Sequence, residues 1–214
     1  MHNIIDYYYA PISGYAYLGE QRLVKLAANT GAELRFKPVD IARVFAESET
    51  VPPFKQSKAR LDYRLMDMQR TADYLQIPIH PKPQYWPVPV ELAARSIYAA
   101  IFAGVDAHKI SFAILSAVYA QQRDVSNPEV LREIFQELNL NVDTLSAALW
   151  SREVTEAYQQ ATAEAIRQGV FGSPTYILNE EEMFFGQDRL DMLAQRLLET
   201  RRGIDSMAGL CVLT

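Results

Sequence analysis

Two short segments at opposite ends of the sequence contain residue types that can do chemistry. Ser13 follows a stretch rich in Ile and Tyr at residues 4–9 and comes just before an amphipathic helical pattern. Far along the chain, Ser173 and Pro174 come just before an apolar stretch at residues 175–178. The first segment is typical of a strand that leads into a helix, and the second of a tight turn before a strand. The hydroxyl of Ser13, at a helix start, is the first candidate for a functional group.

A serine at a helix start has two interpretations that use the same geometry. As an N-cap, its side chain accepts a hydrogen bond from a backbone N–H that lacks a partner within the helix. As a functional group, Ser13 adds a donor to a helix end that already favours anions, including a bound thiolate. A free thiol has a pKa near 8.5, and lowering that pKa by two units needs about 2.7 kcal/mol of preferential interaction with the thiolate. A hydroxyl and a helix terminus can supply that together.

A third polar group, Gly186-Gln187-Asp188, comes before the leucine-rich pattern of the last predicted helix. Asp188 is interpreted either as the N-cap of that helix or as a carboxylate that pairs with the amino group of a ligand. The two interpretations are compatible, since a helix start can satisfy its own backbone and still present polar groups.

Composition and charge argue against several classes of protein. The chain has 214 residues, 49% of them hydrophobic, and its formal net charge of −5 argues against a nucleic-acid partner. No apolar segment approaches the ~20 residues of a membrane span, and no signal peptide is visible, so we expect a cytoplasmic protein without a membrane partner. The single cysteine, Cys211, cannot form an internal disulfide, and His2, His80 and His108 lack the spacing of metal ligands.

The hydrophobic periodicity predicts strands at both ends of the chain and helices between them. A segment with five prolines, residues 78–89, can be neither a helix interior nor a central strand. The predicted elements are a strand at 3–9, a helix at about 16–29, a strand at 33–38, a helical stripe at 61–75, a helical block at about 89–169 in which Pro128 opens one helix, a hairpin of 175–178 with 182–185, and a last helix at 188–200.

The order of these elements is βαβ, then helices, then ββα, which is typical of a thioredoxin-like α/β fold interrupted between its halves by a large all-α insertion. We therefore predict a thioredoxin-like domain from residues 1–78 and 170–200, a helical insertion domain at 79–169, and a C-terminal tail at 201–214 that contains Cys211. The early βαβ unit predicts a right-handed parallel crossover.

The chain resembles the kappa-class glutathione transferase family within the DsbA superfamily, and most of all its bacterial branch, the 2-hydroxychromene-2-carboxylate isomerases. The resemblance extends through about residue 200, and the joint order and spacing of several short motifs make it specific. These motifs are Asp6-Tyr7-Tyr8-Tyr9, Ile12-Ser13, Tyr17-Leu18, Gln21-Arg22-Leu23, Asp40-Ile41-Ala42-Arg43-Val44, Leu61-Asp62-Tyr63, Val170-Phe171-Gly172-Ser173-Pro174-Thr175 and Phe185-Gly186-Gln187-Asp188-Arg189-Leu190.

The resemblance implies glutathione as the cofactor. Ser13 matches the serine that contacts the glutathione sulfur, in place of the first cysteine of a redox-active relative. A cis-proline in such folds opens the third strand and faces the first helix, so that the backbone before Pro174 can pair with an extended peptide. The residues that the resemblance assigns to glutathione are Ser13, Ser173, Pro174, Gly186, Gln187 and Asp188.

For the organic substrate, the resemblance assigns Lys55 and Tyr85, at positions where the isomerases contact their substrate. Buried packing is the alternative interpretation of Tyr85, and a solvated loop charge that of Lys55. The chain also departs from the isomerase pattern. It has Ala10 in place of an acidic residue, Gly14 in place of proline, Phe45 in place of lysine, and Phe54-Lys55 in place of an Asn-Arg pair.

The resulting hypothesis is a glutathione-dependent isomerase of an aromatic or otherwise conjugated 2-oxo acid, active as a homodimer, with glutathione and a small organic molecule as its partners. The thiolate would add to the conjugated double bond, permit rotation, and leave. One alternative is a glutathione transferase that releases the conjugate. Another is a non-catalytic interaction module on a former redox scaffold. A disulfide oxidoreductase is disfavoured, because Ser13 and Ala16 occupy the two redox positions.

Overall fold

The computed structural model describes residues 3–199. Its elements are β1 (Ile4–Tyr9), α1 (Gly14–Thr30), β2 (Glu33–Pro38), α2 (Ile41–Glu47), the 3-10 helix η1 (Pro53–Lys55), α3 (Lys58–Leu75), α4 (Glu91–Phe102), α5 (Ala107–Tyr119), α6 (Pro128–Glu137), α7 (Val142–Ala148), α8 (Arg152–Arg167), β3 (Thr175–Leu178), β4 (Glu182–Phe185), the 3-10 helix η2 (Gln187–Arg189), and a final helix that covers residues 190–199.

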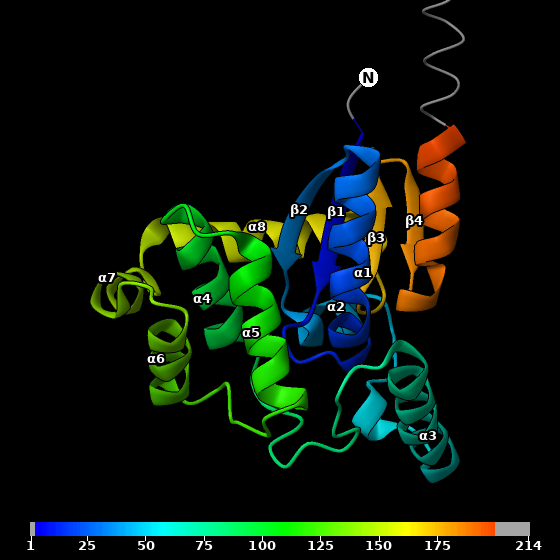
Figure 1. The fold of residues 1–214 in the computed structure, drawn as a ribbon, viewed down its shortest axis with the longest axis horizontal. Coiled ribbons are helices and arrows are strands. Elements are labelled where there is room, and N and C mark those ends of the chain that lie inside the picture. The colour runs from blue at the N-terminus through cyan, green and yellow to red at the C-terminus, as the bar shows by residue number, and fades with distance from the viewer. Residues whose placement is uncertain (1–2, 200–214) are drawn as a thin grey trace, which may run out of the picture.

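The four strands form one sheet in the order β2-β1-β3-β4 (Figure 1). The strand β1 pairs in parallel with β2 through the crossover helix α1, and pairs antiparallel with β3, which continues into β4 as a hairpin. The predicted α/β, thioredoxin-like order with helices between its halves is thus confirmed. The two halves meet because β1 and β3, which are far apart in the sequence, are neighbours in the sheet.

The side chains of β1 alternate between the two faces of the sheet, as a strand requires. On one face, the hydroxyl of Tyr7 donates to Glu20 of α1 (3.4 Å), and Tyr9 donates to Ser111 of α5 (2.7 Å). On the other face, the ring of Tyr8 lies under the ammonium group of Lys37, which also pairs with a carboxylate of α8. Both faces are therefore buried, which is why this strand contains almost no exposed residue.

The helices of the middle of the chain pack on one another and against α1. The ring of Tyr17 on α1 stacks on Phe112 and Tyr119 of α5, with ring centroids 5.6 and 5.8 Å apart. Because buried residues of the sheet and of these helices form one continuous core, α5 is part of the support of α1. The division into a thioredoxin-like domain and an insertion domain at residues 79–169 stays a prediction.

Three local expectations need correction. The helix expected at about 16–29 begins earlier, at Gly14, because Ser13 caps it. Residues 41–47 form a helix that the sequence analysis did not identify, capped by the carboxylate of Asp40. The last helix begins with η2, whose N-cap is Gly186, so Asp188 lies inside the turn instead of capping it. The predicted tail 201–214, with Cys211, lies outside the described residues.

The helix α3 and the proline-rich segment at residues 78–89 lie at one end of the sheet. Figure 1 shows α3 beyond the end of the sheet at which β1 leads into α1. None of the helices described between residues 3 and 199 has the length and apolar character needed to cross a membrane. The polar segments singled out from the sequence all belong to the end of the sheet that faces α3.

Candidate functional site

The turn between β1 and α1 places Ser13 at the helix start. The backbone N–H of Ser13 donates to the carbonyl of Ala10 (2.9 Å), and this turn directs the chain into α1. The Ser13 side chain then accepts from the backbone N–H of Ala16 (3.3 Å) and caps the helix. Ser13 is 8% exposed, so its hydroxyl is held at the positive end of a 17-residue helix and is largely shielded from solvent. The predicted placement of Ser13 at the N-terminus of this helix is confirmed.

The second polar segment lies directly against the first. The hydroxyl of Ser13 donates to the carbonyl of Ser173 (3.2 Å), and the backbone N–H of Ala10 donates to the hydroxyl of Ser173 (2.9 Å). The peptide bond between Ser173 and Pro174 is cis. Two segments 160 residues apart in the sequence therefore share reciprocal hydrogen bonds at the start of α1.

The third polar segment is attached to the second. The backbone N–H of Gly186 donates to the carbonyl of Pro174 (2.9 Å). Gly186 has φ +100°, and a Cβ atom at this position would meet the carboxylate of Asp188, so glycine is required for the turn. The side chain of Asp188 is exposed, 3.5 Å from the guanidinium of Arg189, and it is accessible to a ligand.

Gln187 differs from its neighbours because its side chain is buried. Its amide oxygen accepts from Arg22 of α1 (3.0 Å), and it packs beside Gly19, where a Cβ atom would lie 2.8 Å from the Gln187 Cβ. Arg22 also pairs with Asp191 at 3.0 Å. Gln187 therefore attaches η2 to α1, and its amide oxygen is engaged in that contact.

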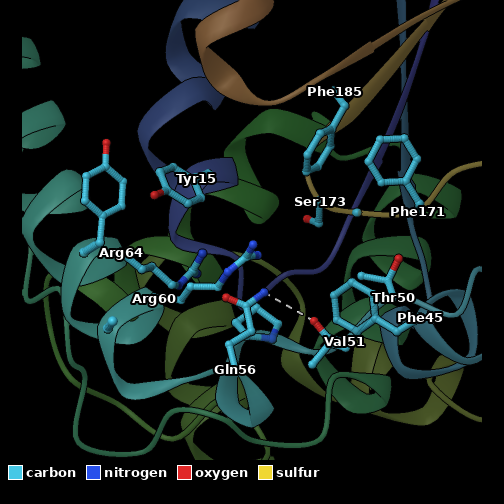
Figure 2. A pocket seen from close by; sticks show the side chains of 14 residues that line it. Tyr15, Phe45, Thr50, Val51, Gln56, Arg60, Arg64, Phe171, Ser173 and Phe185 are labelled. Atoms are coloured by element: carbon cyan, nitrogen blue, oxygen red, sulfur yellow. Dashed lines mark hydrogen bonds between the residues drawn. The ribbon is translucent and has the colours of Figure 1, made fainter.

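Several cavities lie near the start of α1, and three of them are named by one lining residue each. The Ser13 cavity, of about 80 Å³, is lined by Ala10, Ile12, Ser13, Ile41, Phe45, Pro53, Phe54, Arg64, Trp86, Pro87 and Ser173. The Ser173 cavity, of about 670 Å³, is lined by Tyr15, Phe45, Thr50, Val51, Pro53, Gln56, Ala59, Arg60, Tyr63, Arg64, Phe171, Gly172, Ser173 and Phe185 (Figure 2). The Lys55 cavity, also about 670 Å³, lies between α2, η1 and the proline-rich segment, where it includes Lys55, Phe54 and Pro87.

The two residues assigned to the organic substrate lie apart from Ser13. Lys55 is exposed and lines the Lys55 cavity. This cavity does not include Ser13 but shares five lining residues with the Ser13 cavity, namely Ile12, Ile41, Phe45, Phe54 and Pro87. Tyr85 is 43% exposed and lines none of these three cavities, so it is not a buried packing residue. Its neighbour Trp86 lines the Ser13 cavity instead.

Trp86 is held there by the loop that precedes Ser13. The carbonyl of Ile12 accepts from the indole N–H of Trp86 (3.0 Å) and from the hydroxyl of Tyr119 (2.9 Å). Trp86 was not among the site residues assigned from the sequence, and no local signal distinguishes it from Tyr85. The two hydrogen bonds fix the backbone of the turn that positions the Ser13 hydroxyl.

Arg64 is the functional candidate that the sequence analysis missed. It lies on α3 and lines the Ser13 cavity, the Ser173 cavity and a further cavity of about 390 Å³ between α3 and Trp86. A signal was present, because Arg64 is a charged residue on the same face as Leu61 and Met68 of the helical stripe predicted at 61–75. Figure 2 shows Arg60 and Arg64 extending from α3 toward the middle of the Ser173 cavity, with Ser173, Phe171 and Phe185 across from them.

The electrostatics of the site favour an anion. Burial raises the pKa of Tyr15 and of Tyr119 above their ordinary values, so both phenols stay protonated at neutral pH. The Tyr15 hydroxyl donates to Asp67 (2.8 Å), which occupies that carboxylate. No acidic residue lines the Ser13 cavity, and Arg64 and the start of α1 both contribute positive potential there.

The departure at Gly14 from the isomerase pattern has a structural counterpart. A Cβ atom on Gly14 would meet the Cε of Met68 on α3 and the ring of Tyr119 on α5, at 3.0 Å for the ring. These two side chains occupy the space beside the first turn of α1, where a larger residue would otherwise lie. Gly14 therefore allows α3 and α5 to pack close to Ser13.

Residues 4–198 match the family model of the DSBA-like thioredoxin domain, and the chain belongs to this family, in the group that contains the 2-hydroxychromene-2-carboxylate isomerases and the kappa-class glutathione transferases. It is 31% identical to a 2-hydroxychromene-2-carboxylate isomerase of Pseudomonas putida over 89% of this chain and 92% of that protein. It is 24% identical to human glutathione S-transferase kappa 1 over 93% and 92% of the two chains. A solved structure of a 2-hydroxychromene-2-carboxylate isomerase superposes with a TM-score of 0.80, at 28% identity, over 95% of this chain and 98% of that one.

Proposed function

We propose that this protein is a glutathione-dependent isomerase of a conjugated 2-oxo acid. The observation that carries the proposal is the position of the Ser13 hydroxyl, which lies at the start of α1, 3.2 Å from the carbonyl of Ser173, and lines a cavity without acidic residues. The names of the relatives support an isomerase or a glutathione transferase. A cytoplasmic location and a homodimer stay predictions.

Glutathione would lie extended along the polar residues at the end of the sheet. Its backbone would pair with that of Ser173, as a peptide pairs with the edge of a sheet. Its amino group would face the exposed carboxylate of Asp188, and its sulfur would lie near Ser13. The bond from Ser13 to the Ser173 carbonyl is long for an O–H···O bond, which is normally about 2.7–2.8 Å. Rotation of the hydroxyl can therefore exchange this weak bond for one to the thiolate.

The reaction would proceed by reversible addition. Bound glutathione would supply a thiolate that adds reversibly to the double bond conjugated with the ketone, so that this bond could rotate before the thiolate is eliminated and glutathione is regenerated. Ser13 would hold the sulfur at the start of α1 and donate a hydrogen bond to its anionic form.

A glutathione transferase is the second candidate, and the relation to human glutathione S-transferase kappa 1 favours it. The addition step would be the same, but the adduct would be released. Analysis of the product separates the two functions, because an isomerase leaves the glutathione concentration unchanged whereas a transferase consumes glutathione and yields a stable conjugate.

Calorimetry with glutathione on the wild-type protein is the first test, followed by chromatography of 2-hydroxychromene-2-carboxylate incubated with protein and glutathione. We expect one binding site and conversion that depends on glutathione without consuming it. Absence of binding at millimolar glutathione would overturn both enzyme functions and favour a non-catalytic interaction module.

A further inference from the structure

Arg64 is the charged residue that lines the Ser13 cavity, and its surroundings point to a ligand. The other lining residues are apolar or are the two serines. The side chain is half-buried, and it projects from α3 toward the start of α1. A cation that loses part of its hydration in this way normally gains a partner of opposite charge.

The protein supplies no such partner among residues 3–199. The nearby carboxylates on α3 are engaged elsewhere, since Asp67 accepts from Tyr15 and Asp62 pairs with Lys58. The guanidinium instead lies over two aromatic rings, with its Cζ atom 4.9 Å from the centroid of Tyr15 and 5.7 Å from that of Trp86. These contacts fix the group in position and leave edges of its planar fork for an anion.

The walls of the Ser13 cavity suit a flat apolar group. Phe45, Phe54 and Trp86 line it, and the rings of Phe54 and Trp86 meet edge to face, with centroids 6.5 Å apart. A ligand with a conjugated, planar body and a carboxylate at one end would match both these walls and the guanidinium. A guanidinium binds a carboxylate through two parallel hydrogen bonds, which also orients the ligand.

We propose that Arg64 binds the carboxylate of the organic substrate and thereby places the conjugated double bond beside the glutathione sulfur at Ser13. This inference rests on the proposed function and deepens it by assigning the residue that selects an acid. In a conjugated 2-oxo acid, only a few bonds separate the carboxylate from the carbon that the thiolate attacks, so the cation that binds the carboxylate must lie near Ser13, and Arg64 lines the same cavity. The same cation would stabilise the negative charge of the enolate.

Arg60 is a second cation on α3, and its position distinguishes a role in binding glutathione from a role in binding the organic substrate. It lies one turn earlier on α3, is exposed, and lines the Ser173 cavity but not the Ser13 cavity. A carboxylate of glutathione is distant from the sulfur in the covalent structure, and an outer cation such as Arg60 matches that distance better. Arg64 is therefore assigned to the organic substrate.

The test compares a planar acid with its neutral counterpart. Binding of cinnamate and of cinnamamide is measured by calorimetry on wild type, Arg64→Leu, Arg64→Lys and the control Arg70→Leu, which removes an exposed cation from the same helix. We expect Arg64→Leu to weaken the binding of cinnamate by about tenfold or more and the binding of cinnamamide by less than about twofold. Arg64→Lys should retain part of the affinity, and Arg70→Leu should match wild type.

Three results would overturn the assignment. One is an equal loss of affinity for acid and amide in Arg64→Leu, and another is a wild type that binds both equally, because a packing role would then suffice. The third is a loss of glutathione affinity in Arg64→Leu with the affinity for cinnamate unchanged. Failure of the proposed function is a separate result, since discrimination between acid and amide through Arg64 would persist in a protein that neither binds glutathione nor isomerises 2-hydroxychromene-2-carboxylate.

Discussion

Two polar sites lie beside α1, and they differ in whether the protein supplies hydrogen-bonding partners for their charged group. On the side of α5, the carboxylate of Glu20 is fully buried and accepts from Ser111 (2.7 Å), from Tyr7 (3.4 Å) and from the ring of His108 (3.0 Å between nitrogen and oxygen). On the side of α3, Arg64 faces a cavity and has two ring faces but no carboxylate partner in the described chain.

The difference separates a structural cluster from a binding site. A buried carboxylate needs hydrogen-bond donors on both oxygens, because an unpaired buried charge is costly. Glu20 meets this condition within the protein, and so it joins α1 to β1 and α5. Arg64 has no such partners among residues 3–199, so a ligand would supply the missing opposite charge. The contrast points to a binding site at Arg64, which lies beside a cavity and has no carboxylate partner in the described chain.

The largest expected effect on stability comes from removing Glu20. In Glu20→Ala, the donors of Ser111 and Tyr7 lose their acceptor inside the core, and we expect the free energy of unfolding to fall by about 3–5 kcal/mol. Urea unfolding of wild type and variant measures this loss. Asp62→Asn, which changes an exposed carboxylate of α3, is the control and should lie within about 0.5 kcal/mol of wild type. A loss of similar size in both variants would remove the contrast between the two sites.

Ser13→Ala should reduce activity strongly and stability only slightly, in contrast to Glu20→Ala. We expect turnover to fall by about a hundredfold or more, because a donor to the thiolate and its leaving form is lost, while the affinity for glutathione changes little. Stability should fall by only about 1 kcal/mol, the typical loss of an N-cap. Steady-state kinetics, calorimetry and urea unfolding measure the three quantities.

Ser57→Ala is the matched control for this variant. Ser57 caps α3 as Ser13 caps α1, since its side chain accepts from Arg60, but it lies outside the cavity linings described above. It should lose similar stability and keep full turnover. Unchanged turnover in Ser13→Ala would contradict the proposed role of the hydroxyl.

Glu20 should also make stability depend on pH. Burial raises the pKa of Glu20 above its ordinary value, and the donors of His108 and Ser111 only partly offset this effect. The folded state therefore binds the Glu20 proton more tightly than the unfolded state. Its stabilising contribution is complete below the unfolded pKa of about 4.3 and is lost as the pH rises through the folded pKa.

Replacement of Glu20 by glutamine isolates this contribution. The difference in free energy of unfolding between wild type and Glu20→Gln should shift against wild type as the pH rises from about 4 to 7. Urea unfolding across this range measures it, with Asp62→Asn again as the reference. A difference that is constant with pH would show that Glu20 ionises equally in both states. A His108→Gln variant measures how much of this pH dependence comes from the imidazole that faces Glu20.

The smallest expected effect concerns Asp188. This carboxylate is exposed and pairs loosely with Arg189, so Asp188→Asn should not alter stability measurably. If Asp188 faces the amino group of glutathione, the variant should bind glutathione about two- to fivefold more weakly, as expected for the loss of an exposed ion pair. Calorimetry measures it, with Asp191→Asn on the next turn as the comparison. Equal affinities for glutathione in Asp188→Asn and wild type would remove Asp188 from the site.

Much of the fold could be predicted because local rules determine it. The second strand and both strands of the hairpin have the predicted bounds, and Pro128 opens a helix as expected from its fixed backbone angle. The helix at residues 41–47 was missed because it is short and half-exposed, so its hydrophobic pattern is weak. The start of the last helix was misplaced, because a glycine with positive φ ends β4 and opens the 3-10 turn before it.

The sequence by itself determined that Ser13 would cap a helix after the first strand, and it provided the resemblance from which glutathione and its contact residues were inferred. Those inferences depend on residue types and short spacings. Only the tertiary structure decided which side chains from other elements surround Ser13. Arg64 and Trp86 reach the cavity because α3 and the proline-rich segment pack across the end of the sheet, whereas Tyr85 is exposed and does not line it. Contacts between distant segments depend on how whole helices pack, and no local spacing in the sequence encodes that packing.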